Sequence, residues 1–345
     1  MKLLVTGGAG FIGSAFVRYV LAHDEDVQVV TLDKLTYAGN LENLAPVVGS
    51  GRHRFVHGDI CDANVVTSLL KDGVDAIVHF AAESHVDRSI LSPDAFIETN
   101  VRGTATLLDA ARKANLGRFL LVSTDEVYGD IDAPLEADET FSLKPSSPYA
   151  ASKAAADLLA LSYVRTFKLP VVVTRASNNY GPYQFPEKLI PLMISNAILG
   201  LPLPVYGDGL QVRDWLYVDD HCRGILAVLK RGRDGQVYNI GGNCALPNRE
   251  VIRRVIEIVG AAESLMTTVT DRPGHDRRYA LSSEKLARET GFVPDMTFDT
   301  GLAHTVQWYR DNGEWTRRVM SGEYRDYYTK NYGWRDSAAA ASATR

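Results

Sequence analysis

Cysteine is scarce in this sequence. The 345 residues contain three, Cys61, Cys222 and Cys244. An odd number argues against a fully paired disulfide framework, and none of the three belongs to the short Cys-x-x-Cys patterns that hold zinc. We therefore expect ordinary reduced thiols and no metal site.

An excess of positive charge is also missing. Lys and Arg number 37 against 42 Asp and Glu, which leaves a net charge of -5. This balance gives no electrostatic footprint for nucleic acid or for an anionic membrane, so any phosphate-bearing partner has to be held locally. A small nucleotide fits that requirement better than a polymer does.

Long apolar runs are absent as well. The first residues, MKLLVTGGAG, turn glycine-rich too soon for the apolar core of a signal peptide, and no later run is long enough to span a membrane. These features predict a cytoplasmic protein with no membrane segment. A hydrophobic content of 46% is ample for a buried core.

The first half of the sequence has a regular alternation. Short apolar runs such as KLLVT, VQVVTL and FLLVST alternate with helical patterns over residues 11–23, 95–114 and 149–167. Such alternation predicts βαβ units, and therefore an α/β fold with a doubly wound, Rossmann-type parallel sheet. After about residue 175 this rhythm breaks, and we expect further helices near 187–199, 248–259 and 299–312.

The change of rhythm predicts two interleaved domains. We expect a nucleotide-binding domain over 1–177, a smaller α/β substrate domain over 178–335 and a frayed tail over 336–345 with the sequence DSAAAASATR. The segments VRDWLYVDD and VYNIGG look like strands. We expect these strands, near 214–240, to return to the main sheet.

A glycine motif follows the first predicted strand. GGAGFIG places Gly7, Gly10 and Gly13 between that strand and the next helix, where a tight turn and free helical N–H groups suit a pyrophosphate. Asp33 lies twenty residues further on, at the end of the second strand, and can accept both hydroxyls of a ribose. Its charge would repel a 2′-phosphate, so the motif favours NAD over NADP. The alternative is a tight βα turn with an incidental acid.

A second group of residues is typical of redox chemistry. Ser146-Ser147-Pro148 predicts a helix start, which would place Tyr149 and Lys153 on one helical face. An ammonium beside the tyrosine favours the phenolate, although the spacing alone also occurs by chance. The strand FLLVST delivers Thr124, Asp125 and Glu126 to the same sheet edge. Two adjacent carboxyl groups suggest a second proton-transfer step beyond alcohol oxidation.

Taken together, these motifs resemble the extended short-chain dehydrogenase/reductase family, and within it the nucleotide-sugar 4,6-dehydratases that act on dTDP-glucose. The resemblance covers roughly residues 1–335. It rests on GGAGFIG, LDKLTYAGN, GDICD, AAESHVDRS, STDEVYGD, KPSSPYAASKAAAD, SNNYGPYQFPEKLIPLMI, VYGDGLQVRDWLYVDDHCRG, YNIGG and RPGHDRRYA.

The resemblance implies a role for each catalytic residue. Tyr149 would take the proton of the glucose 4-hydroxyl as hydride leaves C4 for NAD, with Thr124 hydrogen-bonded near that oxygen. Glu126 would then abstract the C5 proton while Asp125 protonates the departing 6-hydroxyl. The hydride would return to C6, so NAD would be regenerated in each turnover and stay tightly bound.

The resemblance also implies two binding shells. Besides the three glycines, the residues that would contact NAD are Phe11, Ile12, Asp33, Lys34, Leu35, Thr36, Asp59, Ile60, Phe80, Ala81, Ala82, Glu83, Ser84, Thr99, Tyr149, Lys153 and Asn179. The residues that would hold the nucleotide sugar are Ser84, Thr124, Asn178, Lys188, Leu189, Pro204, Tyr206, Arg213, Asn248, Arg272 and His275. Arg213 and Arg272 suit a diphosphate, although a surface salt bridge is the alternative for either.

Some features depart from the family pattern or leave alternatives open. Ala176 stands where cysteine is expected, and GGNCALPN is unusual around Asn248. A nucleotide-sugar epimerase or decarboxylase would share the fold, NAD and the Tyr149 and Lys153 pair. Neither should need both acids, and a non-catalytic NAD-binding regulator should need none of them. The family also implies a homodimer through a four-helix bundle formed by the helices near 95–114 and 149–167.

Overall fold

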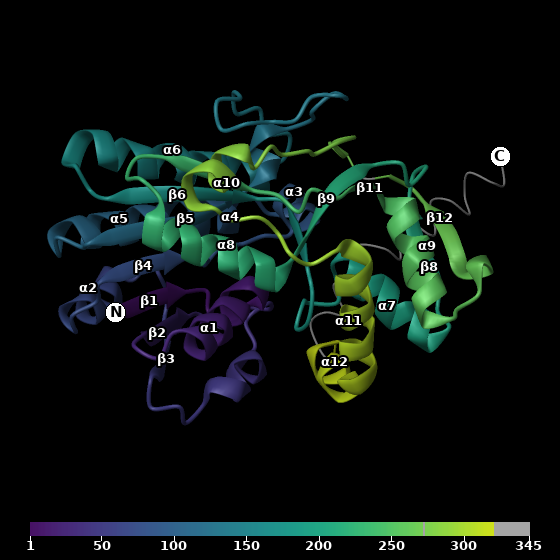
Figure 1. Cartoon of the computed structure of the whole chain (residues 1–345), viewed down its shortest axis with the longest axis horizontal. Coiled ribbons are helices and arrows are strands. Elements are labelled where there is room, and N and C mark those ends of the chain that lie inside the picture. Colours follow the sequence, from purple (N-terminus) through teal and green to yellow (C-terminus); the bar gives the residue numbers. More distant parts are fainter. Residues whose placement is uncertain (272, 321–345) are drawn as a thin grey trace.

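A parallel β-sheet of seven strands forms the centre of the first lobe of the molecule (Figure 1). The computed structural model describes residues 1–271 and 273–320. The strand order, β10-β6-β5-β4-β1-β2-β3, is that of a doubly wound Rossmann-type sheet, which confirms the predicted fold class. The strands are β1 (Lys2–Thr6), β2 (Gln28–Asp33), β3 (His53–His57), β4 (Ala76–His79), β5 (Arg118–Thr124), β6 (Val171–Ala176) and β10 (Val237–Ile240).

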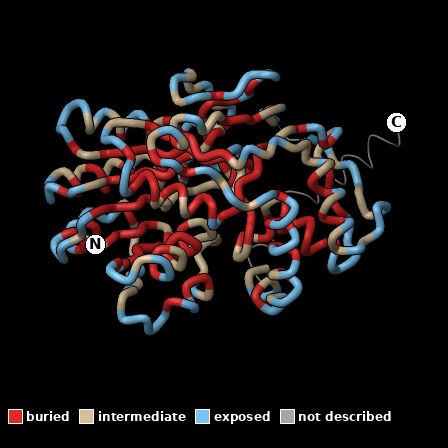
Figure 2. The backbone as a smooth tube through the Cα atoms, viewed as in Figure 1, coloured by how far each residue is buried: buried red, intermediate tan, exposed pale blue. Residues whose placement is uncertain are grey.

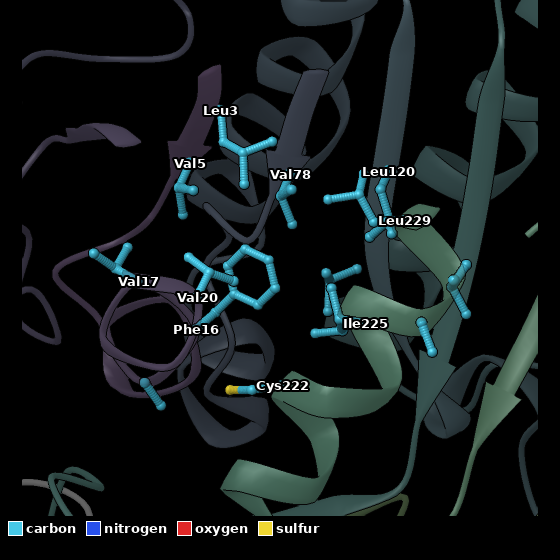
Figure 3. Packing of buried hydrophobic residues seen from close by; sticks show 14 of the residues in the cluster. Leu3, Val5, Phe16, Val17, Val20, Val78, Leu120, Cys222, Ile225 and Leu229 are labelled. Carbon is cyan, nitrogen blue, oxygen red and sulfur yellow. The ribbon is translucent and has the colours of Figure 1, made fainter. Parts of the chain in front are cut away.

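Helices cover both faces of this sheet. One face carries η1 (Leu41–Val47), α1 (Phe11–His23), α8 (Val218–Arg231) and α10 (Glu284–Thr290); the other carries α2 (Ala63–Lys71), α5 (Thr104–Lys113) and α6 (Pro148–Phe167). Alternate strand residues enter the two cores, as the period of a strand requires. Figure 3 shows the first core, in which α1 and α8 meet the strands through Phe16, Val20, Ile225, Leu3, Val78 and Leu120.

Shorter helical segments surround the carboxyl edge of the sheet. They are α3 (Val86–Leu91), α4 (Asp94–Phe96), the π-helical η2 (Ile97–Gly103) and the 3-10 turn η3 (Asp125–Tyr128). The helix predicted over 95–114 is therefore continuous in position but contains a π-helical stretch before α5. No helix among the described residues is both long and apolar enough to cross a bilayer.

The second lobe packs around its own core. It contains a three-stranded sheet of order β11-β9-β7 and a two-stranded sheet of β8 and β12. Its buried hydrophobic residues form a cluster of their own, and Figure 2 shows buried stretches of the backbone in both lobes. Its elements are β7 (Asn178–Tyr180), α7 (Leu189–Leu199), β8 (Leu203–Tyr206), β9 (Val212–Tyr217), β11 (Ala245–Pro247), α9 (Asn248–Val259), η4 (Glu263–Leu265), β12 (Met266–Val269), α11 (Phe298–Asp311) and α12 (Gly313–Met320).

The chain passes back and forth between the two lobes. β10 pairs in parallel with β6 at the edge of the main sheet. β9 does not join that sheet: it pairs with β7 and β11, so the prediction that the strand near 214 returns to the main sheet is wrong. The place beside β6 is taken by β10, and Trp215 and Tyr217 of β9 pack into the core of the second lobe. The predicted tail over 336–345 lies outside the described residues.

Candidate active site

The glycine loop between β1 and α1 requires glycine for steric reasons. Gly7 has φ +70°, and a Cβ there would lie 2.5 Å from the backbone nitrogen of Ala81. At Gly13 a Cβ would lie 2.2 Å from the carbonyl oxygen of Gly7. The first turn of α1 therefore comes close to the loop, and its N–H groups and positive dipole end suit a bound phosphate.

Asp33 ends β2 beside this loop. Its Oδ2 accepts a hydrogen bond from the Ala9 N–H at 2.9 Å, and its Oδ1 accepts one from the Leu35 N–H at 2.8 Å. Burial raises the pKa of the carboxyl group, and these hydrogen bonds oppose the rise. The carboxylate is thus fixed at the end of the strand, where a ribose of a dinucleotide would lie.

One cavity of about 540 Å³ brings most of the predicted cofactor residues together. Among those predictions only Leu35 is outside its lining, since the Leu35 side chain packs against the core beneath α1. Lys34 forms an ion pair with Asp59 at 2.6 Å on one side of the cavity. The lining includes Gly7, Gly10, Phe11, Ile12, Gly13, Asp33, Lys34, Thr36, Asp59, Ile60, Phe80, Ala81, Ala82, Glu83, Ser84, Thr99, Tyr149, Lys153 and Asn179.

The acidic pair lies in the same cavity. β5 ends at Thr124 and the chain turns at once into η3, so Asp125 and Glu126 leave the sheet at its carboxyl edge. The Thr124 hydroxyl caps this turn: it accepts from the Glu126 N–H at 3.3 Å and donates to Asp125 Oδ1 at 3.2 Å. All three residues line the cavity. A strand end and one capping hydroxyl thus orient both carboxyl groups.

The surroundings of Asp125 favour its protonated form. Its side chain is 3% exposed, and burial together with the charge of Glu126 raises its pKa well above the usual range. Arg213 opposes that rise, and Asp214 adds to it. Within the described part of the chain, Asp125 Oδ2 has no hydrogen-bond partner. A buried carboxyl group of this kind is suited to donate a proton.

Tyr149 and Lys153 approach from α6. The Ser147 hydroxyl accepts from the Ala150 N–H at 3.1 Å and Pro148 lies in the first turn, so the predicted helix start is confirmed. Burial raises the pKa of Tyr149 well above its usual range, and a hydrogen bond with Thr124 opposes this. Lys153 Nζ donates to the Val122 carbonyl at 2.7 Å, and burial lowers its pKa to about 8.

A buried polar network supports α6 behind Lys153. Asp157, one turn further along, accepts from Arg175 Nε at 2.9 Å. Arg175 also donates to the Tyr128 hydroxyl at 2.9 Å, and that hydroxyl donates to Asn239 Oδ1 at 2.8 Å. The negative charge of Asp157 opposes the fall in the pKa of Lys153. The sequence analysis missed Asp157, although its position four residues after Lys153 was a usable signal.

Asn100 is a second residue that the sequence analysis missed. Its side-chain amide makes two hydrogen bonds to the Glu83 backbone: it accepts from the N–H at 2.9 Å and donates to the carbonyl at 3.0 Å. It also donates to the Ser152 hydroxyl at 2.8 Å. The π-helical turn η2 thus ties the cavity-lining loop at Glu83 to α6. π-Helical turns often occur at functional sites, but the spacing of apolar residues in the sequence does not reveal them.

The predicted sugar-nucleotide residues divide into two groups. Ser84, Thr124, Asn178 and Lys188 line the cavity, and Lys188 Nζ donates to the Ser84 carbonyl at 3.1 Å. The members of the second group lie outside that lining in the second lobe, and Arg272 lies outside the described residues. The second group consists of Leu189, Pro204, Tyr206, Arg213, Asn248 and His275.

Within the second group, polar side chains contact one another. His275 Nδ1 lies 2.6 Å from Asp271 Oδ1, and the His275 ring meets Tyr206 edge to face. Arg213 donates to the Asp276 carbonyl at 2.9 Å, and its guanidinium lies 4.1 Å from the centre of the Tyr279 ring. Because Arg213 also lowers the pKa of Asp125, its charge reaches the acidic pair from the second lobe.

Other cavity residues carried no sequence signal. His221 Nδ1 bonds Asn179 Oδ1 at 2.8 Å, and burial lowers the His221 pKa to about 3, so the ring stays neutral. Glu187 lies 3.6 Å from His85 Nε2 and accepts from the Tyr37 hydroxyl at 3.2 Å. Among the described residues, no cluster of three His, Cys, Asp or Glu side chains could hold a metal ion.

Comparisons with known proteins agree with this geometry. The family described as GDP-mannose 4,6 dehydratase matches residues 4–305. A dTDP-glucose 4,6-dehydratase of Salmonella typhimurium is 50% identical over 96% of this chain and 99% of its own length. The solved structure of a Streptomyces venezuelae dTDP-glucose 4,6-dehydratase, with NAD and dTDP bound, is 56% identical, covers 92% of this chain and 100% of its own, and has a TM-score of 0.90.

A more distant relative shares the fold at lower sequence identity. The Thermus thermophilus UDP-glucose 4-epimerase, solved with NAD, is 33% identical, covers 90% of this chain and 100% of its own, and has a TM-score of 0.84. The family match over residues 4–305 and the 50% sequence identity over nearly the whole length establish the family of this chain. The chain belongs to the GDP-mannose 4,6 dehydratase family, on the branch of the dTDP-glucose 4,6-dehydratases.

Proposed function

We propose that this protein is a dTDP-glucose 4,6-dehydratase, which converts dTDP-glucose to dTDP-4-keto-6-deoxyglucose and water. The observation that carries the proposal is the meeting of Asp125 and Glu126 with Tyr149 and Lys153 in one cavity. Tyr149 and Lys153 alone would serve a simple oxidation or an epimerisation. The two carboxyl groups supply the proton donor and proton acceptor that loss of water also requires.

The cofactor that fits the cavity is NAD. Glycine is required at Gly7 and Gly13, and the N-terminus of α1 faces the position of a pyrophosphate. The buried Asp33 carboxylate can bind ribose hydroxyls and disfavours a 2′-phosphate. When bound, NAD would take up hydride from C4 of the sugar and return it to C6 in the same turnover.

Tyr149 acts as the base for the sugar 4-hydroxyl. Burial holds Tyr149 as a phenol, so its deprotonation requires positive charge nearby. Lys153 carries that charge below a pH of about 8, and the Val122 carbonyl holds its ammonium in place. The Thr124 hydroxyl also bonds Tyr149, and it favours the phenolate when it turns its proton from Asp125 Oδ1 to the Tyr149 oxygen.

Asp125 and Glu126 divide the elimination between them. Glu126 removes the C5 proton, which a C4 ketone makes acidic, and returns a solvent-exchanged proton to C5 when C6 receives hydride. Asp125, protonated because it is buried beside Glu126, donates its proton to the departing 6-hydroxyl. The capping hydroxyl of Thr124 keeps the two carboxyl groups on the same turn. In this assignment the environment of each acid sets its role.

The nucleotide end of the substrate would extend toward the second lobe. Lys188 lines the cavity, and Arg213 lies close enough to influence Asp125. A guanidinium there can bind phosphate oxygens bidentately. Tyr206, Asn248 and His275 would complete the nucleotide pocket, as the sequence motifs predict.

We also propose that the protein forms a homodimer through a four-helix bundle. α6 exposes Leu158, with 60% of its surface accessible, and η2 exposes Ile97, with 54% accessible. Apolar side chains at these positions suit burial against a second copy. Light scattering on the Leu158→Glu variant should report a monomer where the unmodified protein reports a dimer.

Mass spectrometry of the reaction product tests the proposed activity. Purified protein is incubated with dTDP-glucose in D₂O without added NAD. We expect a product that has lost one water and gained one deuterium at C5. An epimerase would leave the mass of the nucleotide sugar unchanged, and that outcome would refute the dehydratase assignment.

The Glu126→Gln variant tests the assignment of the base. It keeps the shape of the side chain but cannot accept the C5 proton. We expect the variant to reduce its nicotinamide when substrate is added but to incorporate no deuterium. Normal deuterium incorporation would remove Glu126 from this role.

A further inference from the structure

The last described helix, α12, contacts the glycine loop of the first lobe through one amide side chain. Trp315 of α12 is 5% exposed and belongs to the core of the second lobe. Its indole Nε1 donates to Asn43 Oδ1 at 3.1 Å, a contact that joins positions 272 residues apart. The C-terminal part of the second lobe is thus tied to η1 of the first.

Asn43 transmits this contact to the glycine loop. Its Nδ2 donates to the Ala9 carbonyl at 3.0 Å, and Ala9 lies between Gly8 and Gly10 of the loop. The same carbonyl accepts from the Asn40 N–H at 3.0 Å. Asn43 is 2% exposed, and its own carbonyl accepts from Arg18 at 2.6 Å. A buried amide with every polar group bonded holds its neighbours in one arrangement.

Two further contacts hold α12 in this place. Arg318 makes two hydrogen bonds to Glu42, at 2.9 and 2.7 Å. Tyr183 packs against Trp315 with ring centres 5.8 Å apart, and the Arg18 guanidinium lies 4.2 Å from the centre of the Tyr183 ring. The Arg318 pair is exposed and adds little by itself, so the buried indole is the principal contact.

α12 also forms part of the cavity wall. Trp315, Val319 and Asn43 line the same cavity as Gly10 and Phe11. A ligand bound against the glycine loop would therefore lie between the first lobe and this helix. Moving α12 away would remove wall residues and would break the hydrogen bond by which Trp315 orients the Asn43 amide toward the loop.

We propose that α12 is a clasp that retains the dinucleotide, with Trp315 and Asn43 as its positioning residues. This inference rests on the proposed function, in which hydride taken from C4 has to return to C6 of the same sugar. If the reduced dinucleotide were lost between those steps, the 4-keto intermediate could not receive the hydride at C6. A clasp from the second lobe keeps the dinucleotide in place while leaving the sugar free to exchange.

The rate of NAD release tests the clasp. Protein loaded with NAD is freed of excess nucleotide, and released NAD is captured by an auxiliary alcohol dehydrogenase whose product is fluorescent. The Trp315→Phe variant keeps the aromatic packing but loses the N–H donor. We expect release to be about fivefold faster, the factor that one hydrogen bond typically supplies. Arg317→Ala, on the same helix and paired within it to Glu314, is the control and should release NAD at the unmodified rate.

A double variant separates positioning from packing. Asn43→Ala should accelerate release at least as much as Trp315→Phe does. If Trp315 acts through Asn43, then Trp315→Phe should add nothing further in the Asn43→Ala background. Additive effects would show that the two residues act independently and would contradict the proposal that Trp315 acts through Asn43.

The outcomes distinguish failure of the clasp from failure of the proposed function. Unchanged release from Trp315→Phe, with normal conversion of dTDP-glucose, overturns the clasp alone. Faster release from this variant, in a protein that does not dehydrate dTDP-glucose, supports the clasp and overturns the substrate assignment. A protein that cannot be loaded with NAD overturns both.

Discussion

The cofactor end and the nucleotide end of the site are built in different ways. At the cofactor end, Thr124, Asp125, Glu126, Tyr149 and Lys153 all line one cavity. They come from the end of one strand and the first turns of one helix, so the backbone geometry of a parallel sheet places them. In the second lobe, six of the predicted nucleotide residues lie outside the lining of that cavity, and they come from α7, β8, β9, α9 and one loop. Two adjacent elements position the chemistry, while the nucleotide end draws on many separate elements.

This contrast predicts different kinetic effects for the two ends. Substitutions among the residues at the end of β5 and the start of α6 should lower kcat, because they act on the proton transfers. Substitutions in the second lobe should raise KM, because they act on binding that is uniform through the reaction. A substitution at one end whose effect fell on the other parameter would contradict this contrast.

Tyr149→Phe should have the largest effect. It removes the base for the first step and leaves the ring, which packs edge to face with Phe96, in place. We expect kcat to fall by about 10³-fold or more, within the range for loss of a general base. Single-turnover absorbance should show no nicotinamide reduction. A normal rate of reduction would mean that another group takes the proton.

Asp125→Asn should slow the loss of water by about 100-fold while C4 oxidation continues. Because burial and the charge of Glu126 raise the pKa of Asp125, the carboxyl group keeps its proton to a higher pH than an ordinary aspartate and loses it as pH rises through that raised value. In the unmodified protein, water loss should therefore decline on the alkaline side. Quenched-flow mass spectrometry should find no such decline in the variant. If the decline persists there, another group is the acid.

Arg213→Gln should raise KM for dTDP-glucose about tenfold with a smaller change in kcat. A hydrogen bond to a charged phosphate typically contributes enough for that factor. Since Arg213 also lowers the pKa of Asp125, the variant should extend water loss to higher pH. Initial rates across substrate concentration and pH measure both effects. A large fall in kcat alone would move Arg213 to the catalytic end.

Tyr206→Leu should have the smallest effect, a rise in KM of about three- to fivefold, through loss of stacking on the base. Tyr206 meets His275 edge to face, so its ring already has one aromatic neighbour. Comparing dTDP-glucose with glucose 1-phosphate as competing ligands would isolate the contribution of the thymidine monophosphate portion, which carries the base. An unchanged KM would place the base elsewhere.

Sequence reasoning succeeded where local patterns decide the structure. The parallel sheet follows from alternating apolar runs, the start of α6 from Ser147 and Pro148, and the glycine loop from its motif. It failed where distant segments meet. Trp315 and Asn43 carry no local sign of their contact, and Asn100 owes its position to a π-helical turn that periodicity does not encode. The strand β9 was misplaced because its pairing partner depends on competition with β10 for one edge.

The pairing of β10 with β6 at the edge of the main sheet limits where the chain can be cut. Every residue of β6 is buried, and it pairs with β5 on one side and with β10 on the other. A fragment that stopped after the first lobe's own segment, near residue 177, would leave β6 as an apolar edge strand. Exposed edges of that kind recruit other chains and aggregate. The first lobe therefore cannot be produced by simple truncation, and any exchange of substrate lobes between relatives has to keep the returning strand with the sheet that it completes.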